Sequence, residues 1–196
     1  PCQTLPGVLG KVARTGIENR LYLSLIKGID VRTLRLPSDT IGRALGATNR
    51  VYALSGPSIA NEIIRGEPTA VVLVGPRAAT AQRLQHELAT DSFRVYRGRD
   101  RTGVELAGAA KNVLAIAAGI CDGLGFGANA RGALCARGIA ELQRLGRLMG
   151  GRPETFRGLA GLGDLITTCA SPLSRNHHVG FELAKGRHLD DVMSSM

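Results

Sequence analysis

The sequence lacks tryptophan, and aromatic residues make up only 4% of its 196 positions. It also lacks an uninterrupted apolar run of the roughly 20 residues that a membrane-spanning helix needs. The closest stretch, residues 104–121, is interrupted by Glu105, Lys111 and Asn112, so no membrane span is predicted. The opening Pro1-Cys2-Gln3-Thr4 has neither the basic nor the apolar region of a secretory leader. Because it also lacks an initiator methionine, we expect a fragment or a processed chain.

Metal-binding motifs are also missing. The four cysteines form no Cys-x-x-Cys pair, and no histidine stands near them at the spacing of a metal ligand. His177 and His178 are adjacent, so on a helix or strand their side chains point in different directions. We therefore predict no metal site, reduced thiols and a cytoplasmic location.

The charge balance favours anionic partners. The formal net charge is +9 and the pI is about 10.1, which suits nucleic acid, phosphorylated metabolites or dinucleotides. However, the sequence has no long Lys/Arg block and no ladder of aromatic residues on which bases could stack. Nucleic acid is therefore not expected as a partner, and most of the scattered basic residues are interpreted as a solvated surface.

Hydrophobic residues nevertheless reach 44%, enough for a folded core of Ala, Leu, Val and Ile. In the first half, short apolar segments bounded by Gly and Pro predict strands at 21–26, 51–54, 69–74 and 93–96. Residues 77–89 have the periodicity of a helix. Strands separated by helical stretches indicate α/β layering.

The second half is predicted to be helical. The expected helices cover 103–121, 129–149 and 178–186, with a loop or set of short turns over 156–176. We place a domain boundary near Arg99–Thr102, which gives domains at 1–100 and 101–196. The predicted fold class is α/β followed by all-α.

Two glycine-rich stretches match G-x-G-x-x-A, one starting at Gly123 and one at Gly125. A dinucleotide-binding fingerprint must follow a strand and open a helix. These stretches follow a predicted helix instead, so we interpret them as a turn between two helices.

Lys111 is the strongest candidate for chemistry. It is the only charged residue between Glu105 and Asp122, within a segment that is apolar on every side. Burial lowers the pKa of a lysine, and a lysine tuned in this way can transfer a proton near neutral pH. The alternative is a helix-flank lysine whose aliphatic stem lets the ammonium reach water. The sequence alone leaves both interpretations open.

Other polar residues follow strands or turns. Ser174-Arg175-Asn176 could hold an anion, since the guanidinium fork suits phosphate, or it could be a helix cap with a surface arginine. Asp164 could orient an ammonium or simply cap a helix. Lys27 follows a predicted strand, the place where α/β folds put ligand contacts.

The order of these motifs resembles bacterial NAD(P)-dependent glycerol-3-phosphate dehydrogenases. The matching stretches are Lys27-Gly28, 54–62, 66–70, 100–116, 122–129, 155–169 and Ser174-Arg175-Asn176. The resemblance covers essentially the whole chain. It implies a truncated Rossmann-like sheet followed by a helical C-terminal domain that is incomplete.

The resemblance also implies roles for individual residues. Lys111 matches the proton acceptor from the C2 hydroxyl, and Asn112 matches a supporting neighbour. The implied substrate contacts are Lys27, Gly56, Ser58, Lys111, Asp164, Ser174, Arg175 and Asn176. The implied contacts to the cofactor, NAD or NADP, are Lys27, Ala60 and Arg175.

The implied activity is interconversion of sn-glycerol 3-phosphate and dihydroxyacetone phosphate for phospholipid precursor supply, by an enzyme that could form a homodimer. The chain lacks the family's opening strand with its glycine-rich loop, and it stops before a C-terminal segment. We therefore expect an internal piece that alone binds the dinucleotide poorly and turns over slowly or not at all. The alternative is a non-catalytic fragment that binds a phosphometabolite or a protein partner.

Overall fold

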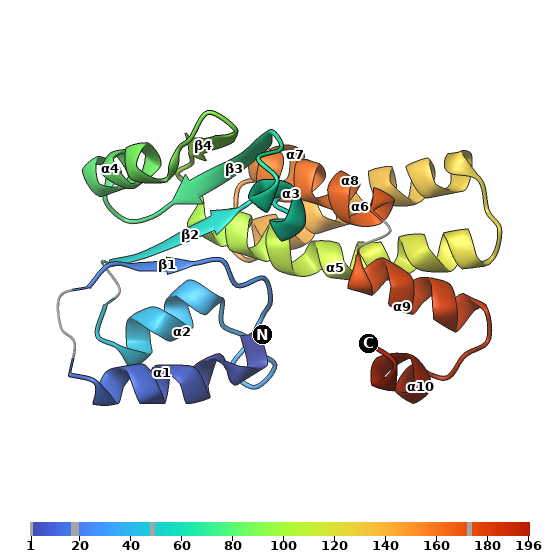
Figure 1. Cartoon of the computed structure of the whole chain (residues 1–196), viewed down its shortest axis with the longest axis horizontal. Coiled ribbons are helices and arrows are strands. Elements are labelled where there is room, and N and C mark those ends of the chain that lie inside the picture. The colour runs from blue at the N-terminus through green and yellow to red at the C-terminus, as the bar shows by residue number, and fades with distance from the viewer. Residues whose placement is uncertain (1, 17–19, 48–49, 172–173) are drawn as a thin grey trace.

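The computed structural model describes residues 2–16, 20–47, 50–171 and 174–196. These residues form a four-stranded sheet in the order β1-β2-β3-β4 (Figure 1). The strands are β1 (Tyr22–Ser24), β2 (Val51–Ser55), β3 (Thr69–Val74) and β4 (Phe93–Arg97). All four predicted strands are confirmed, although β1 is shorter than the predicted segment.

The sheet is mixed. β1 pairs with β2 in parallel and β3 with β4 in parallel, whereas β2 and β3 are antiparallel, with Leu54 opposite Leu73. The carboxyl ends of β1 and β2 therefore point to one edge of the sheet, and those of β3 and β4 point to the opposite edge. Lys27 and the 56–58 turn leave the sheet at the first of these edges.

Helices cover both faces of the sheet. α4 (Ala78–Leu88), predicted from its periodicity, packs through Ala81 against a cluster that includes Tyr52 and Leu73. α1 (Leu5–Arg14) and α2 (Pro37–Ala44) pack around Val51 with the 3-10 turn η1 (Cys2–Thr4) before them. The sequence pattern did not predict α1 or α2, because both are short and begin with proline in their first turn.

The second half is helical, as predicted. Its elements are α5 (Arg101–Gly123), α6 (Ala128–Leu148), α7 (Pro153–Arg157), the π-helical turn η3 (Leu159–Gly163), α8 (Asp164–Ala170), α9 (Arg175–Ala184) and α10 (Leu189–Ser194). A short helix, α3 (Ala60–Ile64), follows β2. The predicted fold class is confirmed, and the glycine-rich stretch after α5 is the predicted turn between two helices. The domain boundary near Arg99–Thr102 stays a prediction.

The prediction of a loop over 156–176 was wrong. α7 ends in it, and η3 and α8 fill most of it; Pro172 and Leu173 lie outside the described residues. The glycines suggested a loop, but at least one of them serves close packing. A Cβ on Gly161 would lie 2.1 Å from the carbonyl oxygen of Phe156, so the tight turn excludes any side chain there.

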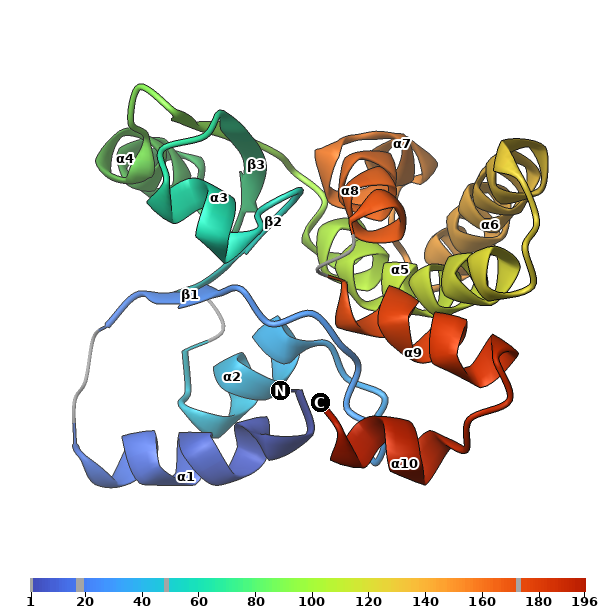
Figure 2. The same cartoon turned by 45° about the vertical axis from the view of Figure 1, so that its right-hand side comes forward.

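α5 is the central helix of this half, with α9 lying along it and α6 beside it (Figure 2). By length and composition it could cross a membrane, and half of its most apolar stretch is buried inside the molecule. Core helices of soluble proteins meet the same criterion. The absence of a membrane span therefore stays a prediction.

Candidate active site

Lys111 lies near the middle of α5 with only 7% of its surface exposed. Its Nζ donates to Oδ1 of Asp164 at 2.5 Å and to Oγ1 of Thr168 at 2.6 Å. The alternative of an ammonium reaching out to bulk water is therefore wrong. A buried ammonium with two oxygen partners has the hydrogen bonds that its removal from water requires.

Asp164 holds a second lysine. Its Oδ2 accepts from Nζ of Lys27 at 2.6 Å, and Lys27 also donates to the carbonyl oxygen of Gly56 at 3.3 Å. The Asp164 side chain is only 3% exposed, against 24% for that of Lys27. One carboxylate thus faces two ammonium groups, which leaves a net positive charge in the site. That excess favours an anionic ligand.

The local fold explains how Asp164 is free for this role. Gly163 occupies the N-cap position of α8, and Asp164 is the first helical residue. A carboxylate in the first turn is favoured by the helix dipole. Because its side chain does not cap the helix, both oxygens are available to Lys27 and Lys111.

The burial of Lys111 changes its acidity. Removal from water lowers the pKa of Lys111 below its ordinary value, since it disfavours the charged ammonium, and the nearby charge of Lys27 acts in the same direction. The Asp164 carboxylate opposes both effects, but the net direction is downward. A lysine with a lowered pKa can exchange a proton closer to neutral pH.

Gly56 shapes the turn after β2. Its φ of 141° lies in a region that side chains rarely adopt, and a Cβ there would lie 3.0 Å from Cα of Val71. Only glycine fits, and the turn directs its carbonyl oxygen to Lys27 and to the hydroxyl of Ser58, which donates at 3.0 Å.

These residues surround a cavity of about 380 Å³, a size typical of small-ligand sites. It is lined by Lys27, Ser58, Ile59, Lys111, Asn112, Asp164, Thr167, Thr168, Ser171, Ser174, Arg175 and Asn176. The structure thus brings together most of the residues singled out from the sequence. Gly56 contributes through its carbonyl, whereas Ala60 lies just outside the lining, exposed at the start of α3.

The Ser174-Arg175-Asn176 triplet combines both interpretations made from the sequence. Ser174 is the N-cap of α9, and its Oγ accepts from the backbone N–H of His177 at 3.2 Å. Arg175 is the exposed first residue of the helix and lines the cavity with Asn176. A cap that presents a guanidinium and an amide to a cavity can hold an anion.

Thr168 was missed by the sequence reasoning. Its Oγ1 accepts from Lys111 and donates to the carbonyl oxygen of Asp164 at 2.6 Å. Asp164 and Thr168 are four positions apart and so share one face of α8. A helix assigned to this segment would have placed them together, but the segment was interpreted as a loop.

A larger cavity, of about 650 Å³, opens between β4 and α7. It contains none of the residues predicted to act on substrate or cofactor, so we identify the site by its charge and chemistry rather than by size. No group of three or more His, Cys, Asp or Glu side chains able to hold a metal ion occurs in the part of the chain that the structure describes. All four cysteines are free thiols.

Comparison with known proteins agrees with this geometry. The model of the NAD-dependent glycerol-3-phosphate dehydrogenase N-terminus matches residues 1–81, and that of the C-terminus matches residues 100–196. The chain is 49% identical to the glycerol-3-phosphate dehydrogenase [NAD(P)+] of Oleidesulfovibrio alaskensis, over its whole length and 60% of the relative. It is 47% identical to that of Gloeobacter violaceus, again over its whole length and over 64% of the relative.

Solved structures show the same relationship. The crystal structure of glycerol-3-phosphate dehydrogenase from Coxiella burnetii superposes on the whole chain with a TM-score of 0.93 and 38% identity, and 59% of that protein is covered. A Dunaliella salina structure superposes with a TM-score of 0.90 and 27% identity, with 35% of it covered. The chain therefore spans roughly 60% of the bacterial relatives that it matches. It belongs to the NAD-dependent glycerol-3-phosphate dehydrogenase family.

Proposed function

We propose that the protein containing this chain is an oxidoreductase that interconverts sn-glycerol 3-phosphate and dihydroxyacetone phosphate with NAD or NADP. One observation carries the proposal: Lys111 is buried against Asp164 in a cavity that also presents Arg175. A proton-transferring amine beside an anion-binding group is what oxidation of a phosphorylated alcohol needs. Family membership and the agreement with bacterial relatives support it.

The anionic end of the substrate is assigned to the α9 cap. Arg175 offers two parallel N–H donors to a phosphate, and Ser174 and Asn176 add neutral donors beside it. Lys27 and Ser58 line the same cavity from the carboxyl ends of β1 and β2. We assign these residues, with the Gly56 turn, Lys111 and Asp164, as the substrate contacts.

Lys111 is assigned the proton transfer. In the oxidative direction its neutral amine takes the proton of the C2 hydroxyl, and in the reductive direction its ammonium returns a proton to the C2 oxygen. The dinucleotide supplies or accepts the hydride. Asp164 and Thr168 fix the direction of Nζ, since both hydrogen-bond it. General acid–base assistance of this kind contributes roughly 10²–10⁴-fold to a rate.

The residues on this chain fit one side of a dinucleotide. Arg175 is exposed at the cavity and can reach a second phosphate, and the Lys27 side chain is 24% exposed beside it. Ala60, just outside the cavity, offers a small surface over which an extended cofactor can lie. We propose these three residues as cofactor contacts and the predicted domains, 1–100 and 101–196, as the two walls of the site.

We place the enzyme in the cytoplasm, where it would supply a phospholipid precursor, and its partner is a phosphorylated small molecule. A homodimer stays a prediction, which analytical ultracentrifugation of the whole protein tests.

The deciding experiment compares two lysine variants of the whole protein. Lys111→Met should lower kcat for dihydroxyacetone phosphate reduction by at least about 10²-fold. Lys11→Met, at an exposed position on α1, should leave it unchanged. Equal activity of the two variants would refute the assignment of Lys111.

The isolated chain gives a second test. We expect it to bind inorganic phosphate through the Arg175 cavity but to bind NADH or NADPH poorly and to turn over slowly or not at all. Full turnover by residues 1–196 alone would contradict that expectation. Phosphate binding with no turnover by the whole protein would instead support a non-catalytic role.

A further inference from the structure

We propose that His177 and Asp122 are positioning residues that hold the Ser174–Asn176 cap at a fixed place relative to Lys111. This inference rests on the proposed function, because it assigns a role in anion binding at the same site. Neither residue lines the cavity. Both act through the helices that carry the lining residues.

Asp122 joins three helices near the end of α5. Its Oδ2 hydrogen-bonds Nε2 of His177, on α9, at 2.8 Å. From α6, Nη1 of Arg131 donates to both carboxylate oxygens, at 3.1 and 2.8 Å. The Asp122 and His177 side chains are only 21% and 17% exposed. Partly buried charged hydrogen bonds of this kind hold their partners more firmly than exposed ones.

His177 is tied at both its ends. Its ring contacts Asp122, while its backbone N–H donates to Oγ of Ser174. The connection from Asp122 to the cap therefore passes through one residue. Arg175 and Asn176 lie between the two tied positions, so the path of the backbone that carries them is fixed on both sides.

The backbones of α5 and α9 are also in close contact. A Cβ on Gly119 would lie 2.0 Å from the carbonyl oxygen of His177, and one on Gly180 would lie 2.0 Å from that of Ile116. These reciprocal contacts leave no space for α9 to slide or move closer. Close packing sets the separation of the helices, and the Asp122–His177 bond sets how the start of α9 is turned.

α5 then acts as a rigid spacer. Lys111 and Asp122 are on the same unbroken helix, about 16 Å apart along its axis at 1.5 Å per residue. The proton-transferring amine and the anchor of the anion-binding cap therefore share one rigid element. Misplacing a bound group by about 1 Å can cost on the order of 10²-fold in rate.

The neighbouring histidine provides a matched control. His178 is exposed, whereas His177 is half-buried against Asp122. The variants His177→Leu and His178→Leu remove the same side chain from adjacent positions of one helix. A general effect of lost histidine charge would affect both, but a positioning effect would affect only the first.

The experiment measures inorganic phosphate binding to the whole protein by calorimetry, and KM and kcat for dihydroxyacetone phosphate and for unphosphorylated dihydroxyacetone. For His177→Leu we expect phosphate binding on the order of 10-fold weaker and a matching rise in KM for the phosphorylated substrate. Turnover of the unphosphorylated substrate should stay unchanged, which a general loss of structure would not allow. His178→Leu should match the unmodified protein.

Two further variants keep the result decisive. His177→Gln, which retains a side-chain N–H, should recover part of the binding. Combining His177→Leu with Asp122→Leu should cost no more than either change alone, since both break the same contact. Unchanged phosphate binding in His177→Leu, or equal losses in the two histidine variants, would overturn the positioning role. If Arg175→Ala leaves phosphate binding intact, the proposed anion pocket itself fails, and the positioning role fails with it.

Discussion

Lys27 and Lys111 direct their ammonium groups at opposite oxygens of one carboxylate, that of Asp164, at 2.6 and 2.5 Å. Lys27 comes from the end of a strand and Lys111 from the middle of a helix, so the carboxylate joins the sheet to the helical half. The same contact holds the proposed proton donor in place and keeps a surplus of positive charge in the cavity.

Replacement of Asp164 by asparagine should therefore affect both lysines. Asp164→Asn removes the main influence that raises the pKa of Lys111, so this pKa should fall further below its usual value. Loss of one partner from a buried ion pair typically costs about 3–5 kcal/mol. NMR titration of lysine side chains measures the pKa, and urea unfolding measures the free energy.

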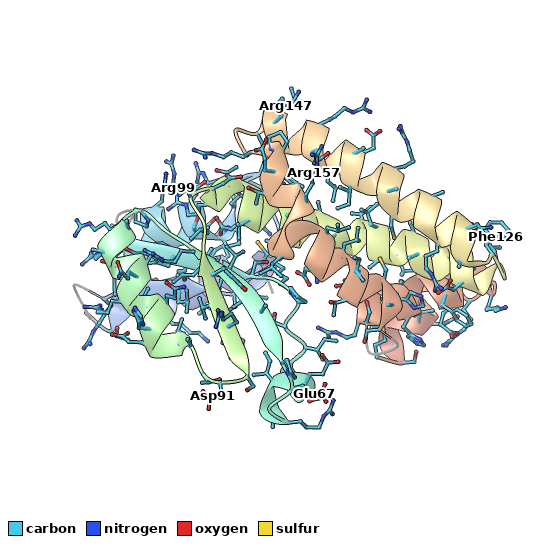
Figure 3. The ribbon with its side chains drawn as sticks, turned by 90° about the horizontal axis from the view of Figure 1, so that it is seen from above. Glu67, Asp91, Arg99, Phe126, Arg147 and Arg157 are labelled. Atoms are coloured by element: carbon cyan, nitrogen blue, oxygen red, sulfur yellow. The ribbon has the colours of Figure 1, made fainter. Side chains whose placement is uncertain are left out.

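Asp91→Asn is the matched control, at an exposed position on the loop before β4 (Figure 3). It should change neither quantity. A Lys111 pKa that rises in Asp164→Asn would contradict the proposed electrostatics of the site.

The lowered pKa of Lys111 also predicts how the oxidation rate depends on pH. Oxidation needs the neutral amine, so log kcat/KM for sn-glycerol 3-phosphate should rise with pH and level off below the ordinary lysine value of 10.5. The folded protein releases this proton at a lower pH than the unfolded chain. The contribution of Lys111 to the free energy of unfolding therefore grows as pH rises between those two pKa values.

A pH series of initial rates in the whole protein measures this profile. Lys111→Arg, which keeps the charge but titrates far higher, should abolish the ascending limb. An unmodified enzyme whose rate is flat over that range would show that another group transfers the proton.

The site residues could be predicted because each has a distinctive sequence setting. Lys111 stands alone in an apolar helix, and Arg175 lies between two short polar residues after a turn. Strands were also predictable, since continuous apolar segments such as 69–74 pair on both sides and are bounded by Gly or Pro.

The remaining features depend on contacts between distant segments. Gly161 lies in a tight turn against Phe156, yet the same residue type in sequence suggests a loop. Thr168 became recognisable only once α8 placed it one turn from Asp164. The bond between His177 and Asp122 joins residues that are 55 positions apart, and no local pattern indicates it.

Glu105 gives a prediction about stability. It is buried on α5, and its carboxylate accepts from the backbone N–H and the hydroxyl of Ser38 at 2.8 and 2.5 Å. Burial raises the pKa of Glu105 above its ordinary value, although the Ser38 hydrogen bonds partly oppose this. Its stabilising contribution is therefore complete below the unfolded pKa of 4.5 and is lost as pH rises through the folded pKa.

Glu105→Gln should flatten this part of the pH dependence when urea unfolding is measured between about pH 4 and 8. Glu67→Gln, at an exposed residue in the turn before β3 (Figure 3), should leave the slope as it is. A slope that Glu105→Gln does not alter would mean that Glu105 titrates normally.

The close approach of α5 and α9 predicts opposite effects for two glycine substitutions. Gly119→Ala places a methyl group 2.0 Å from the carbonyl oxygen of His177, a backbone atom that cannot easily move. It should destabilise the fold by about 1–3 kcal/mol or more. Gly132→Ala on α6 meets nothing within 4 Å and should stabilise it by roughly 0.5–1 kcal/mol.

Thermal unfolding of the two variants measures the difference. A Gly119→Ala protein as stable as Gly132→Ala would show that the two helices are not in close backbone contact.

The proton-transfer role of Lys111 is tested most directly by a crystal structure of the whole protein with dihydroxyacetone phosphate bound. We predict Nζ of Lys111 within about 2.6–3.2 Å of the C2 oxygen, with the phosphate held by the Arg175 guanidinium. A substrate bound with its C2 oxygen beyond the reach of Lys111, or with its phosphate away from Arg175, would contradict the proposed mechanism.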